Sequence, residues 1–237
     1  SGRVYLLEFD DGGGGADGYE GEGERPAARR IWEERDDLYS LDYAAGASDN
    51  GAGLIAVGHH ARGLVALDGR GRLRWRLGPQ DGTAMRFRTW HATISPDGGR
   101  VYAAPLGAGT EGRPGAPRHL IVAIDAGTGK SVHTRPVFSP VTLLASLPRP
   151  LGVAAVHRET SRAAAIHGFA GCCVTAYDAD LRGPAWSLNC PAGITVTAIA
   201  PAPGRPALML GTNTGELWRV GAYTGRILAT YDLLFPS

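Results

Sequence analysis

The feature that most constrains the fold is a short apolar run, ending in aspartate and followed by a turn, that recurs along the chain. Five copies are present: VYLLEFD from residue 4, LVALD from 64, IVAID from 121, VTAYD from 174 and the degenerate LWRVG from 217. These copies end at Asp10, Asp68, Asp125, Asp178 and Gly221, which are 58, 57, 53 and 43 residues apart. Repetition at such a period indicates an array of similar structural units.

Each copy has an apolar strand on either side. A turn and a second strand follow the anchor, as in LDGRGRLRWRL with Trp75 and YDADLRGPAWSL with Trp186. Upstream, RTWHATISPDGGRVYAAPLG at 88–107 has the pattern of strand, turn and strand, and related segments begin at residues 47, 142 and 198. Each repeat therefore predicts four antiparallel strands, with A and B before the anchor, C ending on it and D after it. Such units are the blades of a β-propeller.

The predicted fold is all-β, with four complete four-stranded blades and one partial blade in a single propeller domain. We expect strands C and D of the partial blade in residues 1–37, and complete blades at 38–78, 79–140, 141–190 and 191–237. An acidic, Gly-rich insertion is expected at 8–30 and a Gly- and Pro-rich one at 107–118. Because a two-stranded blade leaves sheet edges unprotected, we expect the chain to be part of a larger ring whose remainder lies upstream. A five-bladed ring with a thin first blade is the alternative.

The composition of the chain limits the classes of partner that we expect. The 237 residues are 43% hydrophobic, and 24 Lys and Arg nearly balance 23 Asp and Glu. A globular core is therefore expected, and no global field favours nucleic acid or an anionic membrane as partner. No apolar run approaches the roughly 20 residues that span a bilayer. Three cysteines, an odd number, do not form a disulfide framework, which favours a reducing, cytoplasmic setting.

Two groups of propellers resemble these repeats. VALDGRGRLRW and VAIDAGTGKSVH resemble the repeat of quinoprotein-like propellers. In that repeat an apolar strand ends in Ala-x-Asp, and a turn then leads to an outer strand that carries an aromatic residue. WHATISPDGGRVYAA and GELWRVGAYTGRIL resemble WD-repeat propellers, although the Trp-Asp pair of that repeat is absent. The resemblance covers almost the whole chain and implies architecture far more than activity.

No catalytic or metal-binding residues are predicted. Asp10, Asp68, Asp125 and Asp178 recur as a set, which indicates a shared structural role in accepting backbone N–H bonds at the turn between strands C and D. The segment GTGKS at 127–131 lacks the first glycine of a phosphate loop and is predicted to be a hairpin turn. His59 and His60 are neighbours on a strand and point to opposite faces, so they do not share a metal. His91 is expected to be structural.

The preferred function is a non-catalytic scaffold or protein-interaction domain whose partners are other proteins or other domains of the same parent chain. Arg72, Arg74 and Arg76 alternate with apolar residues, so one face of their strand is predicted to be cationic. That face either protects a sheet edge or meets an acidic partner. The alternatives are a propeller that binds pyrroloquinoline quinone with calcium, as quinoprotein-like propellers do, and a propeller appended to a multidomain adenylate-forming enzyme.

The adjacent cysteines Cys172 and Cys173 raise one further question. Quinoprotein alcohol dehydrogenases stack their cofactor on a disulfide between neighbouring cysteines, but these two are predicted to begin a strand C. A continuing strand opposes the turn-like peptide that such a bridge requires. Small buried thiols are therefore expected, and a bridge from either residue to Cys190 is left open.

Overall fold

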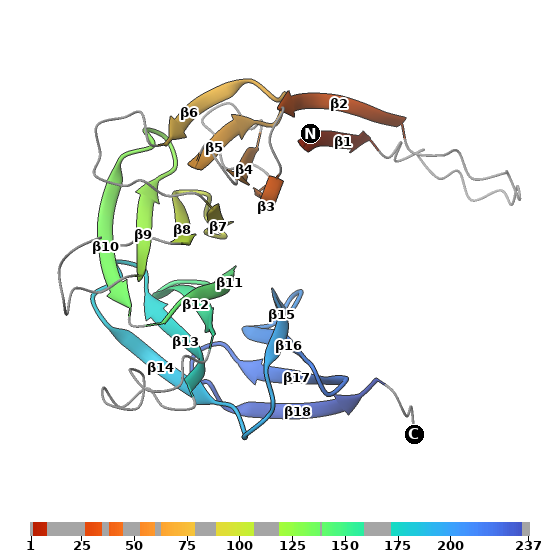
Figure 1. Cartoon of the computed structure of the whole chain (residues 1–237), viewed down its shortest axis with the longest axis vertical. Coiled ribbons are helices and arrows are strands. Elements are labelled where there is room, and N and C mark those ends of the chain that lie inside the picture. Colours follow the sequence, from red (N-terminus) through yellow and green to blue (C-terminus); the bar gives the residue numbers. More distant parts are fainter. Residues whose placement is uncertain are drawn as a thin grey trace, which may run out of the picture.

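The computed structural model describes residues 2–8, 27–34, 38–44, 53–59, 63–78, 89–106, 119–137, 139–158 and 172–233. These residues form four four-stranded antiparallel sheets and one two-stranded sheet. The sheets follow one another in chain order around an open arc (Figure 1). The predicted all-β architecture of four complete blades and one partial blade is confirmed, and the ring is not closed. Nowhere in the described segments does a helix have the length and apolarity needed to cross a membrane.

Every sheet is a meander of strands consecutive in the chain. The first blade contains β1 (Gly2–Glu8) and β2 (Ala27–Glu34). The second contains β3 (Leu38–Ala44), β4 (Leu54–His59), β5 (Gly63–Asp68) and β6 (Leu73–Leu77). The third contains β7 (Thr89–Ile94), β8 (Arg100–Leu106), β9 (His119–Asp125) and β10 (Ser131–Val137).

The fourth blade contains β11 (Val141–Ser146), β12 (Leu151–His157), β13 (Cys172–Asp178) and β14 (Pro184–Asn189). The fifth contains β15 (Val196–Pro201), β16 (Ala207–Thr212), β17 (Glu216–Gly221) and β18 (Ile227–Asp232). One boundary differs from expectation: β2 begins at Ala27, inside the segment predicted to be an insertion, because Ala27 and Ala28 continue the ladder opposite Glu8 and Leu7. Residues 9–26, which include Asp10, and 107–118 lie outside the described residues.

Burial explains the apolar runs of the middle strands. Every residue of β4 and β5 is buried, whereas β14 alternates between exposed and half-buried residues. A strand packed on both faces is apolar at consecutive positions and not at alternate ones. Strands B and C are therefore the interior of each blade, and strand D is its outer edge.

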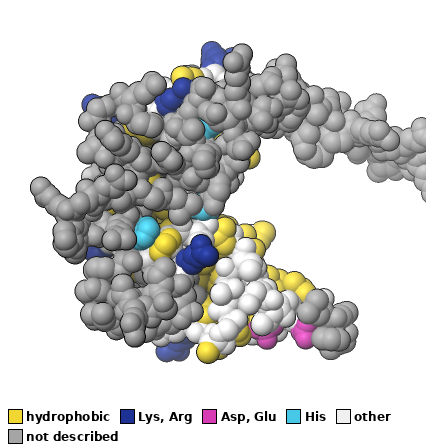
Figure 2. All heavy atoms as spheres, in the orientation of Figure 1, with side chains coloured by type: hydrophobic (Ala, Val, Ile, Leu, Met, Phe, Trp, Pro, Cys, Tyr) yellow, Lys and Arg dark blue, Asp and Glu magenta, His cyan; other side chains and the backbone are white. Residues whose placement is uncertain are grey.

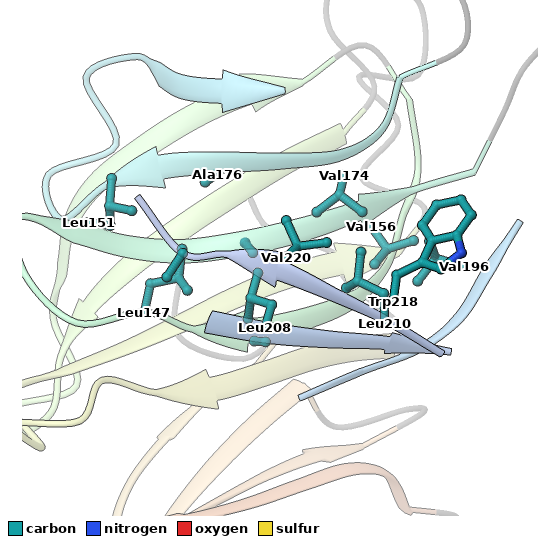
Figure 3. Packing of buried hydrophobic residues seen from close by; sticks show 13 residues of the cluster. Leu147, Leu151, Val156, Val174, Ala176, Val196, Leu208, Leu210, Trp218 and Val220 are labelled. Atoms are coloured by element: carbon teal, nitrogen blue, oxygen red, sulfur yellow. The ribbon is translucent and has the colours of Figure 1, made fainter. Parts of the chain in front are cut away.

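Three hydrophobic clusters fill the spaces between consecutive complete blades. They join the second blade to the third, the third to the fourth and the fourth to the fifth. In the last of these, Val156 and Val174 of the fourth blade lie opposite Leu210 and Trp218 of the fifth (Figure 3). The alanine of each Ala-x-Asp motif belongs to the cluster shared with the following blade: Ala66, Ala123 and Ala176. A small side chain at this position lets the next sheet approach closely.

Polar side chains link the innermost strands of three blades. Asp42 on β3 accepts hydrogen bonds through Oδ2 from the Thr93 hydroxyl at 2.7 Å and from the Ile94 backbone N–H at 2.8 Å. Thr93 in turn accepts a bond from the backbone N–H of Ser146 on β11 at 3.2 Å. These bonds hold β3, β7 and β11 in a fixed relation on the inner side of the arc.

Among the described residues, no further blade packs on the fifth sheet at the open end of the arc. Hydrophobic side chains lie exposed on this sheet in Figure 2, and the large ones include Leu228 and Tyr231 of β18, which are 54% and 43% exposed. Here Arg219 stands two residues before the anchor Gly221, where the other complete blades have alanine. Arg219 pairs with Met209 and Ala229, and its buried Nε has no hydrogen-bond partner among the described residues. The last sheet therefore differs chemically from the faces that pack on a following blade.

Candidate functional site

Turns of two kinds project from one edge of each complete blade. Because consecutive strands are antiparallel, the turn between strands A and B and the turn between strands C and D leave the sheet at the same end. The described A–B turns are 95–99, 147–150 and 202–206, and the described C–D turns are 69–72, 126–130, 179–183 and 222–226. We call the surface made by these turns, by the aspartates that precede the C–D turns and by Arg100, which follows the 95–99 turn, the turn face.

The recurring aspartates directly precede the C–D turns and accept hydrogen bonds from backbone N–H groups of those turns. Asp68 accepts bonds from Arg70 and Arg72, each at 2.9 Å. Burial raises the pKa of Asp68, but the hydrogen bonds from Arg72 and Arg70 outweigh it and hold the pKa below its ordinary value. Asp178 is bonded in the same way by the backbone N–H groups of Asp180 and Arg182.

Asp125 uses a slightly different set of donors. Its Oδ1 accepts bonds from the hydroxyl and the backbone N–H of Thr128, at 2.7 and 2.9 Å. These bonds, led by the hydroxyl, lower the pKa of Asp125. The carboxylates of all three aspartates are thus engaged by their own turns.

A tryptophan on strand D fastens two of these turns to the preceding blade. The Trp75 indole donates to the Ala126 carbonyl at 2.8 Å, and the Trp186 indole donates to the Ala222 carbonyl at 2.7 Å. Each ring also lies against a turn glycine with positive φ, Gly129 or Gly225. A Cβ added to Gly129 would lie 2.7 Å from Trp75 Cγ, and one added to Gly225 would lie 2.5 Å from Trp186 Cε3. We call this tryptophan, carbonyl and glycine arrangement the tryptophan latch.

At the C–D turn of the fourth blade, the contacts with the third blade are polar. His133 occupies the strand position of Trp75 and Trp186, because each lies opposite the alanine of its Ala-x-Asp motif. Its Nε2 lies 3.4 Å from Oδ1 of Asp180 in the C–D turn of the fourth blade. The Tyr102 hydroxyl donates to the Ala179 carbonyl at 3.1 Å, and burial raises the pKa of Tyr102 to about 12.

Cationic side chains outnumber carboxylates on the described turn face. The carboxylates are Asp68, Asp97, Asp125, Asp178 and Asp180. The eight cations are Arg70, Arg72, Arg100, Lys130, Arg149, Arg182, Arg205 and Arg226. Four of the cations pair with carboxylates in the described part of the chain: Arg72 with Asp68, Arg100 with Asp125, Arg149 with Asp97, and Arg182 with Asp180. The other four are exposed and have no such ion pair among the described residues.

A pocket of about 230 Å³ opens on the turn face between the A–B turns of the third and fourth blades. Its lining combines apolar side chains with Asp97, Arg100, Tyr102 and Arg149. Asp97 accepts a bond from the Ser95 hydroxyl at 2.6 Å and from Arg149 Nε at 2.9 Å. The Ser95 bond is the main cause that lowers the pKa of Asp97. The sequence predicted one of these turns in SPDGG and the other in the related segment that begins at residue 142, but neither motif indicated that the two turns enclose one pocket.

The predicted arginine strip is only partly a strand face. Arg72 precedes β6, and its Nε bonds Asp68 Oδ2 at 2.7 Å. Arg74 is half-buried and Arg76 is exposed. On the other face Trp75 is buried, whereas Leu73, the first residue of the strand, is 56% exposed. Arg72 therefore belongs to the turn face, whereas Arg74 and Arg76 lie on the outer strand.

The described histidines do not assemble into a metal site. No group of three or more His, Cys, Asp or Glu that could hold a metal occurs in the described segments. His59 is buried at the end of β4, and His91 lies half-buried on β7, where burial lowers its pKa to about 4. The pKa of His157 at the end of β12 is lowered to about 4, chiefly by burial. His60 lies outside the described residues.

Cys190 follows β14 and is disulfide-bonded. Cys172 at the start of β13 pairs with Asn189 in the strand register, which brings the two chain segments together. A bridge to Cys190, left open by the sequence, is therefore present. Since the chain has three cysteines, this bridge is incompatible with a disulfide between Cys172 and Cys173.

Comparison with known proteins rests on structure. No protein-family model matches the sequence, and no curated protein matches it. Sqt1 from Saccharomyces cerevisiae is similar with a TM-score of 0.62 at 12% identity, over 96% of this chain and 55% of that chain. The β-propeller domain of Cps50 (Swd1) from Myceliophteria thermophila has a TM-score of 0.58 at 15% identity, over 85% and 57%. BamB from Moraxella catarrhalis has a TM-score of 0.54 at 17% identity, over 85% and 52%.

The fold is a β-propeller. The β-propeller fold expected from the sequence is confirmed. The chain spans little more than half the length of these three structures. At such low identity the likeness shows the fold alone, so the function of this propeller must be argued from its own surface.

Proposed function

We propose that the chain is a non-catalytic β-propeller that binds an acidic surface of another protein, or of another domain of its parent chain, through the turn face. The observation that carries this proposal is that most carboxylates of that face are bonded within the protein, whereas half of its cations are exposed and have no ion pair among the described residues. Its recurring aspartates accept hydrogen bonds from their own turns, whereas Arg70, Lys130, Arg205 and Arg226 are exposed without a described ion pair. Outward-facing charge is therefore mainly positive.

Rigidity supports the same role. Turns that are fastened to neighbouring blades present their side chains in fixed positions, so a partner meets a surface that needs little ordering. The tryptophan latches hold the C–D turns of the third and fifth blades in this way. Complementary charge then raises the rate of encounter and favours acidic partners over others.

The test uses the whole chain and a defined acidic probe, fluorescein-labelled poly-L-glutamate, followed by fluorescence anisotropy. We expect binding that weakens between 50 and 300 mM salt, because surface charges are screened over roughly 8 to 10 Å at physiological ionic strength. Reversal of Arg70, Lys130, Arg205 and Arg226 to glutamate should abolish binding. Reversal of Arg74 and Arg76 on the outer strand is the matched control and should leave most of it.

Two results would overturn the proposal. One is equal binding of poly-L-glutamate to the fourfold variant and the unchanged protein. The other is tighter binding of an oligothymidine of the same charge, which would indicate a nucleic-acid surface. Pyrroloquinoline quinone with calcium should leave the melting temperature and the absorbance spectrum of the quinone unchanged.

A further inference from the structure

The pocket between the third and fourth blades combines an apolar floor with a charged rim. Leu147 and Leu151 are 1% and 6% exposed, and they contribute to the lining with Pro96 and Pro148. Arg149 is far more accessible, with a side chain that is 70% exposed. The pocket thus offers apolar contact at its base and positive charge at its opening.

The size of the pocket selects the kind of ligand. At about 230 Å³ it is smaller than the roughly 300 to 1,000 Å³ typical of clefts that hold drug-sized molecules. One apolar side chain fits such a volume better than a ring-system cofactor does. The four apolar lining residues would contact that side chain on several sides and remove it from water.

Arg149 is held in place, yet part of its guanidinium is still available. Asp97 Oδ2 accepts a bond from Arg149 Nε, while Asp97 Oδ1 is engaged by the Ser95 hydroxyl at 2.6 Å and the Gly99 N–H at 3.1 Å. No carboxylate of the described residues bonds the two Nη atoms of Arg149. Asp97 therefore orients a cation whose outer nitrogens can pair with a carboxylate from outside.

We propose that this pocket binds one large apolar side chain of a partner protein, and that a neighbouring Asp or Glu of the same partner segment pairs with Arg149. The proposal rests on the proposed function, because it names the segment that the turn face would recognise. It adds a sequence requirement to the general preference for acidic partners: an apolar residue flanked by carboxylates. The four exposed cations of the turn face that have no ion pair among the described residues would contribute attraction of longer range.

The probe is a fluorescein-labelled heptapeptide with a central leucine, two glutamates on each side and glycine at both ends. Two matched peptides replace the leucine by glycine or the glutamates by glutamine. Anisotropy titration against the whole chain should give about tenfold tighter binding for the leucine peptide than for the glycine peptide, the effect expected for burying one leucine side chain. The glutamine peptide should bind too weakly to measure.

Variants of matched exposure locate the effect. Arg149→Gln should weaken binding of the leucine peptide several-fold more than Arg205→Gln, in the A–B turn of the next blade, because only Arg149 pairs with a carboxylate beside the pocket. Amide shifts of Tyr102 and Leu151 should change on titration with the leucine peptide only. Melting curves verify that each variant folds, and Arg149→Ala provides a second truncation if the glutamine forms a new bond.

The outcomes separate this proposal from the proposed function. Equal affinity for the leucine and glycine peptides, with binding still lost in the fourfold charge-reversal variant, would overturn the pocket and leave the turn face. The same conclusion follows if Arg149→Gln and Arg205→Gln weaken the leucine peptide equally. If neither peptide nor poly-L-glutamate binds, both proposals fail.

Discussion

The indole nitrogen of Trp75 lies 2.8 Å from the carbonyl oxygen of Ala126, in the next blade of the arc. Trp75 and Ala126 are both buried. Water therefore cannot readily replace this hydrogen bond, and the acceptor depends on the indole.

Replacement of Trp75 by phenylalanine should lower the free energy of unfolding by about 1 to 3 kcal/mol, because it keeps an aromatic ring but leaves the Ala126 carbonyl unsatisfied. Chemical denaturation measures the change. The control is Trp218→Phe, since the Trp218 indole donates to Oε2 of Glu216, a half-buried side chain. Water can replace the indole as donor to the Glu216 carboxylate, so Trp218→Phe should lower the free energy of unfolding by less than Trp75→Phe. An equal decrease for both variants would contradict the role assigned to the latch.

Substitution of Gly129 by alanine should destabilise the chain through two effects. The residue has φ +71°, and its new Cβ would lie 2.7 Å from Trp75 Cγ. Left-handed backbone costs about 1 to 2 kcal/mol for a residue with Cβ, and overpacking adds about 1 to 3 kcal/mol. Gly204→Ala isolates the first effect, because Gly204 has φ +65° and no atom within 4 Å of the added Cβ. A melting temperature no lower for Gly129→Ala than for Gly204→Ala would disprove the contact.

Stability should fall as the pH drops from about 6.5 to about 4. Burial lowers the pKa of His157 from 6.5 to about 4, so the unfolded chain binds the proton first and the folded state loses stability throughout this window. The loss amounts to at most about 3 kcal/mol for this group, by the free energy of one pKa unit. Denaturation at pH 7 and pH 4.5 measures it. In His157→Gln the pH dependence should be shallower, and an unchanged slope would exclude His157 as its source.

The bridge at Cys190 predicts a definite thiol count. Denatured, unreduced protein should react with one equivalent of a thiol reagent, and reduced protein with three, because the chain has three cysteines. Cys190→Ser should raise the unreduced count to two and lower the melting temperature, since the cross-link restricts the unfolded chain. Three reactive thiols without reductant would show that the bridge does not form in solution.

Replacement of Arg219 by methionine should leave the stability of the chain unchanged or raise it. The half-buried guanidinium has an Nε without a hydrogen-bond partner among the described residues, and exchanging an uncompensated buried polar group for an apolar one is commonly neutral or favourable. The exposed Arg205 provides the control, and Arg205→Met should change the melting temperature very little. A clear loss of stability in Arg219→Met alone would mean that Arg219 has a stabilising partner.

The order of the strands could be predicted because it depends on local patterns. LVALD and IVAID form β5 and β9, each ending on its aspartate, and the Pro-Asp-Gly-Gly turn separates β7 from β8. The turn aspartates also act locally, because Asp68 and Asp178 accept hydrogen bonds from backbone N–H groups two and four residues ahead. Periodicity and turn chemistry act over a few residues, so a single sequence contains them.

Contacts between blades could not be read in the same way. Trp75 and Trp186 were recognised as outer-strand residues, but their acceptors Ala126 and Ala222 lie in the following repeat. Asp97 and Arg149 are likewise 52 residues apart and meet only because two neighbouring sheets align their turns. The start of β2 at Ala27 has a similar origin, because pairing with β1 overrode the loop-like composition.

The tryptophan latch needs a tryptophan in one repeat and a turn glycine in the following repeat, so neither repeat forms it alone. A tryptophan introduced at His133 would meet a turn whose positive-φ residue is the buried Leu181 in place of a glycine, so it would need a second change in the following blade. Loss of Gly129 would likewise remove the space that Trp75 occupies. Among homologues, the two partners should therefore be exchanged together, and a repeat copied into a new position would carry only half of its joint.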